Sequence, residues 1–372
     1  MARWVLLVVA FELALTGCAS LNARRAPDRS TAELAHAGRE RGLPLHDPLE
    51  FAPEHAAVIA EQVRRDGNEG ERAHRLARWL KDTMPGFSYA EGESLTADEA
   101  WREQQGDCFA KTNLFVAAAR QIGIEARYTY VREVGRYRER SGSFVVSSHV
   151  AAEYGHGPNP EVVDFERVPD ERTLYTFQPI TDLEAAALFN SNLAIQHLLH
   201  GRTHLAEGML RFLIERSPEL PELSSNLAVV LIQLGRPAQA REVLTEAISR
   251  SPTYPPLYTN AVAASLAMGD DASARDWENR GRSVANDDAL FMLGQGLRRY
   301  TLHDYRGAAE RFERATELQD DSSVAWAWLA RARLAEGRVD AGRRAFTRAR
   351  RLSPDDPRLR DLLQQAPQLG AE

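Results

Sequence analysis

Lysine and cysteine are both scarce in this sequence of 372 residues. Only Lys81 and Lys111 are lysines, so arginine carries almost all of the positive charge, which indicates a GC-rich genome rather than selection for guanidinium chemistry. No basic excess is present either, since the net charge is -7, and this gives no reason to expect nucleic acid or an anionic lipid surface as the main partner. Beyond residue 15 no apolar run approaches the length of a transmembrane helix. The apolar content of 44% suits a soluble protein with a substantial core.

The first 18 residues have the pattern of an export signal. Arg3 precedes an apolar run from Trp4 to Leu15, which is too short to span a bilayer as a helix. The run ends in Leu15-Thr16-Gly17-Cys18, which resembles the bacterial lipoprotein cleavage box and implies a lipidated Cys18. By the same resemblance, Ala19 after the cysteine implies the outer membrane of a Gram-negative cell envelope, facing the periplasm. An ordinary secretory signal cut near Ala19, or an uncleaved anchor, is the alternative.

The second cysteine, Cys108, follows a predicted tight turn at Gly106-Asp107 and opens a predicted amphipathic helix. The helix dipole and the N–H groups at a helix start favour a thiolate there. If Cys18 is lipidated it cannot form a disulfide, so Cys108 is a lone thiol in an oxidising compartment, an odd choice for packing. The alternative interpretation is a small buried hydrophobic residue. One helical face carries the thiol and an apolar stripe, formed by Cys108, Thr112, Phe115, Ala119 and Ile122.

Residues 19–50 are rich in Ala, Arg and Pro and are predicted to be a flexible tether. Helical patterns follow after Pro53, and Thr96-Ala97-Asp98-Glu99 has the form of a capping box. After Gly123 the apolar period changes from 3.6 to 2. The predicted strands are Ala126–Val131, Phe144–Tyr154, which contains His149, Val162–Val168, which contains Asp164, and a fourth candidate at Leu174–Phe177. Helices followed by antiparallel strands predict an α+β domain over residues 51–182.

The region from Leu76 to Ile180 resembles the transglutaminase-like superfamily, a papain-like thiol fold. The resemblance is carried by Phe87-Ser88-Tyr89, Gly106-Asp107-Cys108, the segment 118–127, His149 opening His-Val-Ala-Ala-Glu-Tyr, and Val163-Asp164-Phe165. It implies that Cys108 is the nucleophile, His149 the base and Asp164 the orienting acid. The physical argument agrees, because a carboxylate that holds one imidazole nitrogen leaves the other to accept the thiol proton. His156, in the turn between the two strands, is the fallback base.

A repeat with a period of 34 residues fills the second half of the chain. It resembles the tetratricopeptide repeat, with five copies over residues 187–354 and a capping helix at Asp356–Gln365, and we assign residues 183–366 to this all-α solenoid. Such solenoids bind protein or peptide partners on their concave face. The columns are Gly201, Gly235, Gly269 and Gly337 with His303 out of pattern; Ala206, Ala240, Ala274, Ala308 and Gly342; and Pro218, Pro252 and Pro354.

Three further features are open to more than one interpretation. An asparagine column at Asn192, Asn226 and Asn260 either bonds a peptide backbone in the groove or maintains the fold. The histidines His197, His200 and His204 fall at variable repeat positions, which argues against a metal site. Gly294-Gln295-Gly296 follows no strand and is not a nucleotide loop. The sequence therefore predicts no metal and no cofactor.

Two functions from different classes follow from these patterns. The first is an envelope-anchored thiol enzyme that acts on amide bonds, a peptidase or amidase in preference to a cross-linking transferase, with repeats that bind a protein partner or substrate. The second is a non-catalytic lipoprotein scaffold whose repeats mediate protein–protein interaction. Substrate, partner and oligomeric state cannot be read from the sequence.

Overall fold

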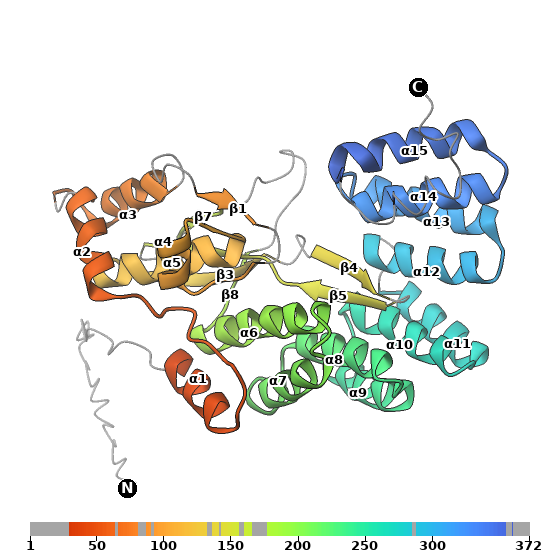
Figure 1. Ribbon diagram of the computed structural model, residues 1–372, viewed down its shortest axis with the longest axis horizontal. Helices are drawn as coiled ribbons and strands as arrows, with labels where there is room; N and C mark the ends of the chain where they lie inside the picture. The colour runs from red at the N-terminus through yellow and green to blue at the C-terminus, as the bar shows by residue number, and fades with distance from the viewer. Residues whose placement is uncertain are drawn as a thin grey trace, which may run out of the picture.

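The computed structural model describes residues 30–63, 66–80, 87–90, 93–131, 136–140, 143–155, 160–165, 177–284, 288–354 and 359. In these ranges the chain forms a mixed domain of helices and strands, from α2 to β8, here called the N-terminal domain (Figure 1). The helices α6 to α15, here called the repeat array, follow as an arc beside it (Figure 1). Cys18, His156 and, apart from residue 359, the predicted helix Asp356–Gln365 lie outside the described residues.

The N-terminal domain is built around one buried helix, α5 (Cys108–Gln121). It packs against β3 and β6 of the main sheet, and α2 (Pro53–Gln62), α3 (Glu69–Arg78) and α4 (Ala97–Glu103) also contact it. The sequence predicts a single apolar face, whereas 11 of the 14 residues of α5 are buried. A helix that is apolar on nearly every side is one that lies inside a core.

The predicted capping box before α4 is confirmed. Thr96 accepts a hydrogen bond from the backbone N–H of Glu99 at 3.3 Å, and the Glu99 carboxylate accepts one from the Thr96 N–H at 2.9 Å. These two bonds satisfy donors that a helix start otherwise leaves unpaired. They fix the entry of the short helix that leads the chain toward Cys108.

The main sheet is antiparallel with the order β7-β6-β3-β8. Its strands are β3 (Ala126–Val131), β6 (Val150–Tyr154), β7 (Glu161–Val163) and β8 (Phe177–Pro179). The short strands β1 (Ser88–Tyr89) and β2 (Gln105–Gly106) pair in parallel just before α5.

The strand predicted over Phe144–Tyr154 is two strands in the structure. Its first part is β5 (Ser143–Ser147), which pairs with β4 (Arg136–Arg140) in a separate hairpin, and its second part is β6. Ser148 and His149 lie between them, in neither strand. The hairpin leaves the main sheet because β5 contacts the repeat helices α8 and α10 instead of continuing into the core of the domain.

The prediction of a flexible tether over residues 19–50 is wrong for residues 30–50. Helix α1 (Ser30–Glu40) packs against α6, and its face of Thr31, Leu34, Ala35 and Gly38 is buried. Farther along, the backbone of His46 exchanges two hydrogen bonds of 2.9 Å with the side-chain amide of Asn190 in α6. The segment is therefore held by the repeat array, and a helical apolar spacing in the sequence was the missed signal.

The repeat array consists of the five predicted helix pairs. The first helices of successive pairs contact one another and so form one layer of the arc. Small residues in the alanine column are buried where the paired helices meet. The pairs are α6 (Asp182–Leu199) with α7 (Thr203–Arg216), α8 (Pro221–Gln233) with α9 (Pro237–Arg250), α10 (Pro255–Ala267) with α11 (Asp271–Arg282), α12 (Ala289–Thr301) with α13 (Tyr305–Leu318), and α14 (Ser323–Ala335) with α15 (Val339–Leu352).

The glycine column is explained by backbone conformation. The glycine that closes the first helix of a pair has a positive φ, for example 72° at Gly235, and an added Cβ there would meet no atom within 4 Å. The requirement is therefore one of φ and not of space. His303, which stands in this column in the fourth repeat, adopts the same left-handed conformation with a φ of 60°.

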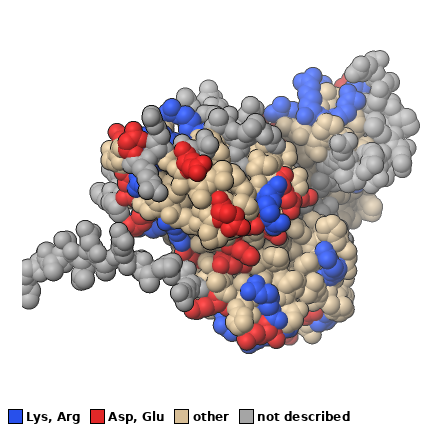
Figure 2. All heavy atoms as spheres, turned by 60° about the vertical axis from the view of Figure 1, so that its left-hand side comes forward, with Lys and Arg blue, Asp and Glu red and all other residues tan. Residues whose placement is uncertain are grey.

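The net charge of -7 gives no reason to expect an extended basic surface. On the face shown in Figure 2, acidic and basic side chains are interspersed over the described atoms. In the part of the chain that the structure describes, no helix is both long enough and apolar enough to cross a bilayer.

Candidate active site

Cys108 lies in the first turn of α5 and is 7% exposed. Gly106, two residues before it, has a φ of 143°, and a Cβ at this position would come within 2.3 Å of the Ala110 side chain. Only glycine allows the chain to turn so closely onto the helix it is about to start. The motif Gly106-Asp107-Cys108 thus has a steric basis.

Asp107 is the N-cap of α5. Its Oδ1 accepts a hydrogen bond from the Ala110 N–H at 3.1 Å, and its Oδ2 accepts one from the Ser94 hydroxyl at 2.6 Å. The Asp107 N–H donates in turn to the carbonyl of Glu93. The start of the helix, and with it the position of Cys108, is fixed by a buried set of polar contacts.

His149 and Asp164 form a hydrogen-bonded pair. Nε2 of His149 lies 3.0 and 3.1 Å from the two carboxylate oxygens of Asp164. The His149 side chain is 2% exposed and that of Asp164 is 12% exposed, so the pair is largely removed from water. The register that pairs Ala152 with Val163 sets the two residues diagonally across the ends of β6 and β7, and not directly opposite each other. The predicted proximity of this histidine and this aspartate is confirmed.

Two contacts align α5 with β6 and so bring Cys108 toward His149. The Thr112 hydroxyl donates to the carbonyl of Val150 at 3.2 Å, and farther along the rings of Phe115 and Tyr154 lie 6.2 Å apart. Helix and strand therefore run in the same direction side by side. Cys108 lies one helical turn before Thr112, and His149 is the residue before Val150.

The sequence places Thr112 on the Cys108 face of the helix but does not predict its hydrogen bond to Val150. A hydroxyl in an otherwise apolar stripe is a signal for a buried hydrogen bond, and Thr112 is 0% exposed. Ser94 gave no signal in the sequence. Its contact with Asp107 spans 13 residues, and Asn192 of α6 also donates to its hydroxyl, at 3.3 Å.

The asparagine column maintains the fold, which is one of the two roles that the sequence left open. Asn260 donates to the Ser225 hydroxyl of the preceding repeat at 3.0 Å, which maintains the array. Asn226 makes the equivalent bond to Ser191 at 3.2 Å. Its amide also accepts from the N–H of Val146 at 2.8 Å and donates to the Val146 carbonyl at 3.0 Å. Asn226 therefore bonds the backbone of the β5 strand of the same chain, and binding of a separate peptide in the groove stays a prediction.

The three repeat histidines do not converge on a common site. His200 Nδ1 lies 2.8 Å from the carbonyl of Gln196, and His204 lies 3.9 Å from Glu207. Burial lowers the pKa of His197, with a smaller contribution from the positive charge of Arg202. Over the residues that the structure describes, no three His, Cys, Asp or Glu side chains are grouped as metal ligands.

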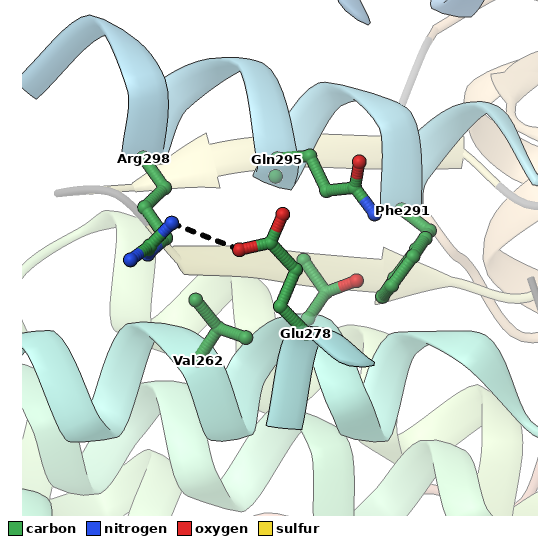
Figure 3. Close-up of a pocket in the computed structure, with 7 residues that line it drawn as sticks. Val262, Glu278, Phe291, Gln295 and Arg298 are labelled. Atoms are coloured by element: carbon green, nitrogen blue, oxygen red, sulfur yellow. Dashed lines mark hydrogen bonds and ion pairs between the residues drawn. The ribbon is translucent and has the colours of Figure 1, made fainter. Parts of the chain in front are cut away.

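A small cavity lies in the repeat array, between α10, α11 and α12 (Figure 3). Its charged groups are matched, because Arg298 donates to Glu278 at 2.9 Å. The Gln295 amide points into the same space and has no hydrogen-bond partner among the described residues. Gly294 and Gly296 lie inside α12, not in a loop, against Thr259 and Phe312. The cavity is lined by repeat residues and contains neither Cys108 nor His149.

Comparisons with known proteins agree with this division of the chain. A family model of the transglutaminase-like superfamily matches residues 56–158, which include Cys108 and His149, and Asp164 follows six residues later. Models of the tetratricopeptide repeat match residues 192–255, 231–293 and 300–366. The comparison with curated proteins gave no match.

Several solved structures are similar to this chain, and TTC0263 and YrrB among them are described as TPR proteins. TTC0263, a thermophilic protein of Thermus thermophilus, is 22% identical, with 48% of this chain and 98% of that chain covered and a TM-score of 0.43. The pilF protein of Pseudomonas aeruginosa is 16% identical, covers 50% of this chain and 87% of its own, and has a TM-score of 0.36. YrrB, described as a TPR protein with an unusual peptide-binding site, is 12% identical, with 48% and 92% covered and a TM-score of 0.32. From the family models and the fold together, the chain consists of a transglutaminase-like domain followed by tetratricopeptide repeats.

Proposed function

We propose that this protein is a thiol enzyme of the bacterial cell envelope that acts on amide bonds through Cys108, His149 and Asp164. The observation that carries the proposal is the buried His149–Asp164 pair, with Nε2 at 3.0 and 3.1 Å from the carboxylate, where His149 immediately precedes the strand β6 that packs against the helix begun by Cys108. A carboxylate on one ring nitrogen and a thiol at a helix N-terminus are the two requirements for a cysteine nucleophile.

In the proposed reaction the Cys108 thiol gives its proton to Nδ1 of His149, because Nε2 faces Asp164. The carboxylate holds the tautomer and stabilises the imidazolium that forms. The thiolate attacks the amide carbon, a C–S bond forms, and the Cys108 backbone N–H donates to the resulting oxyanion. The imidazolium then protonates the leaving amine as the C–N bond breaks, which leaves a thioester on Cys108.

The thioester is resolved by a water molecule that His149 deprotonates, which releases the acid and restores the thiol. An amine in place of water would give transfer. We propose hydrolysis, and so a peptidase or amidase, as the activity. Cys18 carries the lipid that anchors the protein at the outer membrane, and the repeats bind the protein partner or substrate on the part of their concave face that β5 leaves uncovered.

The test is alkylation of the purified protein with iodoacetamide at mildly acidic pH. We expect Cys108 to react faster than a model thiol and His149→Ala to abolish the difference. A Cys108 that reacts no faster than a model thiol, with a rate unchanged in His149→Ala, would refute the catalytic proposal. Trapping of an acyl group on Cys108 from cell-envelope extract, identified by mass spectrometry, would then name the substrate class.

The competing function is a non-catalytic lipoprotein scaffold, favoured by the extent of the repeat array from residue 182 to residue 352. A Cys108→Ala strain that behaves like the wild type, together with a defect when residues 183–366 are deleted, would support the scaffold. A defect in the Cys108→Ala strain would support the enzyme.

A further inference from the structure

Two asparagines of the repeat array reach into the transglutaminase-like domain, one toward each partner of the proposed thiol–imidazole pair. Asn226 binds both backbone groups of Val146, three residues before His149. Asn192 donates to the Ser94 hydroxyl, which donates to Asp107, the residue before Cys108. Both links connect segments that are 80 or more residues apart in the chain.

The contact at Val146 has the geometry of a strand pair. In an antiparallel ladder, alternate residues direct their N–H and C=O groups to opposite edges of the strand. β5 pairs with β4 along one edge, and at Val146 the opposite edge is matched by the Asn226 amide, which accepts from the N–H and donates to the carbonyl. A single side chain thus takes the place of a neighbouring strand and covers an edge that would otherwise be open.

All side chains in these links are buried. Asn226 is 1% exposed, and Ser94, Asp107 and Asn192 are likewise buried. Buried hydrogen bonds are costly to break, because the groups left behind lose water as well as partner. Apolar packing reinforces the join, since Phe109, next to Cys108, lies 5.9 Å from the ring of Phe189 in α6.

We infer that the repeat array is a positioning element of the active site, and that Asn226 and Asn192 set the placement of His149 and Cys108. The inference rests on the proposed function. Asn226 holds the strand that delivers His149, and Asn192 holds the N-cap that starts the Cys108 helix. The face of α8 and α10 that contacts β5 is occupied by the enzyme's own hairpin, so this part of the repeat array supports the active site.

The chain provides a matched control in the same column. Asn260 makes the same bond to the preceding repeat as Asn226 does, to Ser225 in place of Ser191. Asn260→Ala therefore removes a hydrogen bond between repeats and leaves the two hydrogen bonds between Asn226 and Val146 in place. Asn226→Ala removes the equivalent bond between repeats together with the two bonds to Val146.

The experiment uses the full chain and measures the rate of Cys108 alkylation against pH, with the thermal midpoint of each variant and hydrogen exchange of residues 143–150. We expect Asn192→Ala, which removes one hydrogen bond, to slow alkylation at pH 6 by about fivefold, and Asn226→Ala, which removes three, to slow it more. Asn260→Ala should lower the thermal midpoint and leave the pH profile unchanged. Faster exchange of residues 143–150 than in the wild type is expected in Asn226→Ala.

Two outcomes would overturn the inference, each for a different reason. If His149→Ala slows alkylation while Asn226→Ala and Asn192→Ala match Asn260→Ala, the triad stands and the positioning role is wrong. If His149→Ala does not slow alkylation, the proposed function fails and the inference fails with it. Asn226→Leu guards against a cavity in the alanine variant, because leucine has a similar volume and removes the same hydrogen bonds to Val146. It should give the same shift in the pH profile.

Discussion

Replacing Asp164 by asparagine is the most direct perturbation of the proposed site. The substitution keeps the size of the side chain and removes its charge, so the imidazolium formed at His149 loses its counter-ion. Nε2 lies 3.0 and 3.1 Å from the carboxylate oxygens, and His149 is 2% exposed. An exposed ion pair would contribute under about 1 kcal/mol, but this pair is shielded from solvent.

The expected magnitude follows from these distances and this burial. A hydrogen bond to a charged group is worth about 1.5–3 kcal/mol, and each 1.36 kcal/mol is a factor of about ten in rate. Asp164→Asn should therefore slow alkylation of Cys108 at pH 6 by about 10- to 150-fold. The difference should shrink above pH of about 8.5, where an ordinary thiol ionises without help.

The assay is the second-order rate of iodoacetamide alkylation between pH 5.5 and 9, with the site of labelling checked by mass spectrometry. A matched control is Asp98→Asn, which breaks another His–Asp pair of the domain, where His55 Nδ1 lies 2.7 Å from Asp98. This variant should lose stability and keep the wild-type alkylation profile. An Asp164→Asn protein that alkylates at pH 6 within a factor of two of the wild type would refute the reasoning.

Further predictions concern the stability of the repeat array. His303→Gly should raise the free energy of unfolding by about 0.5–1 kcal/mol, because it relieves a φ of 60° at a non-glycine residue. Gly235→Ala should lower the free energy of unfolding by about 1 kcal/mol. Urea unfolding measures both, and a loss of stability in His303→Gly would contradict the explanation of the glycine column. Glu278→Gln should lower the free energy of unfolding by about 3 kcal/mol, since the Arg298 side chain, which is only 11% exposed, loses its carboxylate partner. An unchanged thermal midpoint would show that the pair contributes nothing. Burial opposes ionisation of Glu207, but hydrogen bonds from two arginines outweigh it and hold its pKa below the usual value. The stability that the Glu207 carboxylate contributes is thus present above the ordinary pKa of a glutamate and is lost as pH falls through the lowered value. Glu207→Gln should therefore reduce the loss of stability at acid pH. An unchanged dependence of stability on pH in this range would contradict the prediction.

Some features of the molecule can be read directly from local pattern. The five helix pairs are predictable because each tetratricopeptide repeat is one local unit whose contacts are with its neighbours, so the period of 34 residues contains the architecture. The capping box at Thr96 and the start of α5 at Cys108 are predictable because caps and turns depend on a few adjacent residues. The pairing of His149 with Asp164 is predictable because His149 precedes β6, Asp164 follows β7, and these two strands are consecutive in the chain and pair with each other.

Other features depend on contacts between distant segments and escape sequence-based prediction. The sequence predicts a tether over residues 30–50, but α1 finds its partner in α6, more than 140 residues later. It also predicts a continuous strand containing His149, which the structure divides because β5 pairs with β4 and is bound by Asn226, 80 residues away. Local propensity contains no information on which distant amide will meet a strand edge.

The sequence by itself determined the elements of this protein: the repeat period, the helix that begins at Cys108, and the order of cysteine, histidine and aspartate. These depend on backbone preferences and apolar spacing within a few turns of chain. Only the tertiary structure decided that the repeat array and the transglutaminase-like domain are joined through the buried side-chain amides of Asn192 and Asn226. Such bonds are selected by the packing of whole surfaces, because an asparagine side chain has the same local preferences whether it faces solvent, a neighbouring repeat or the strand before His149.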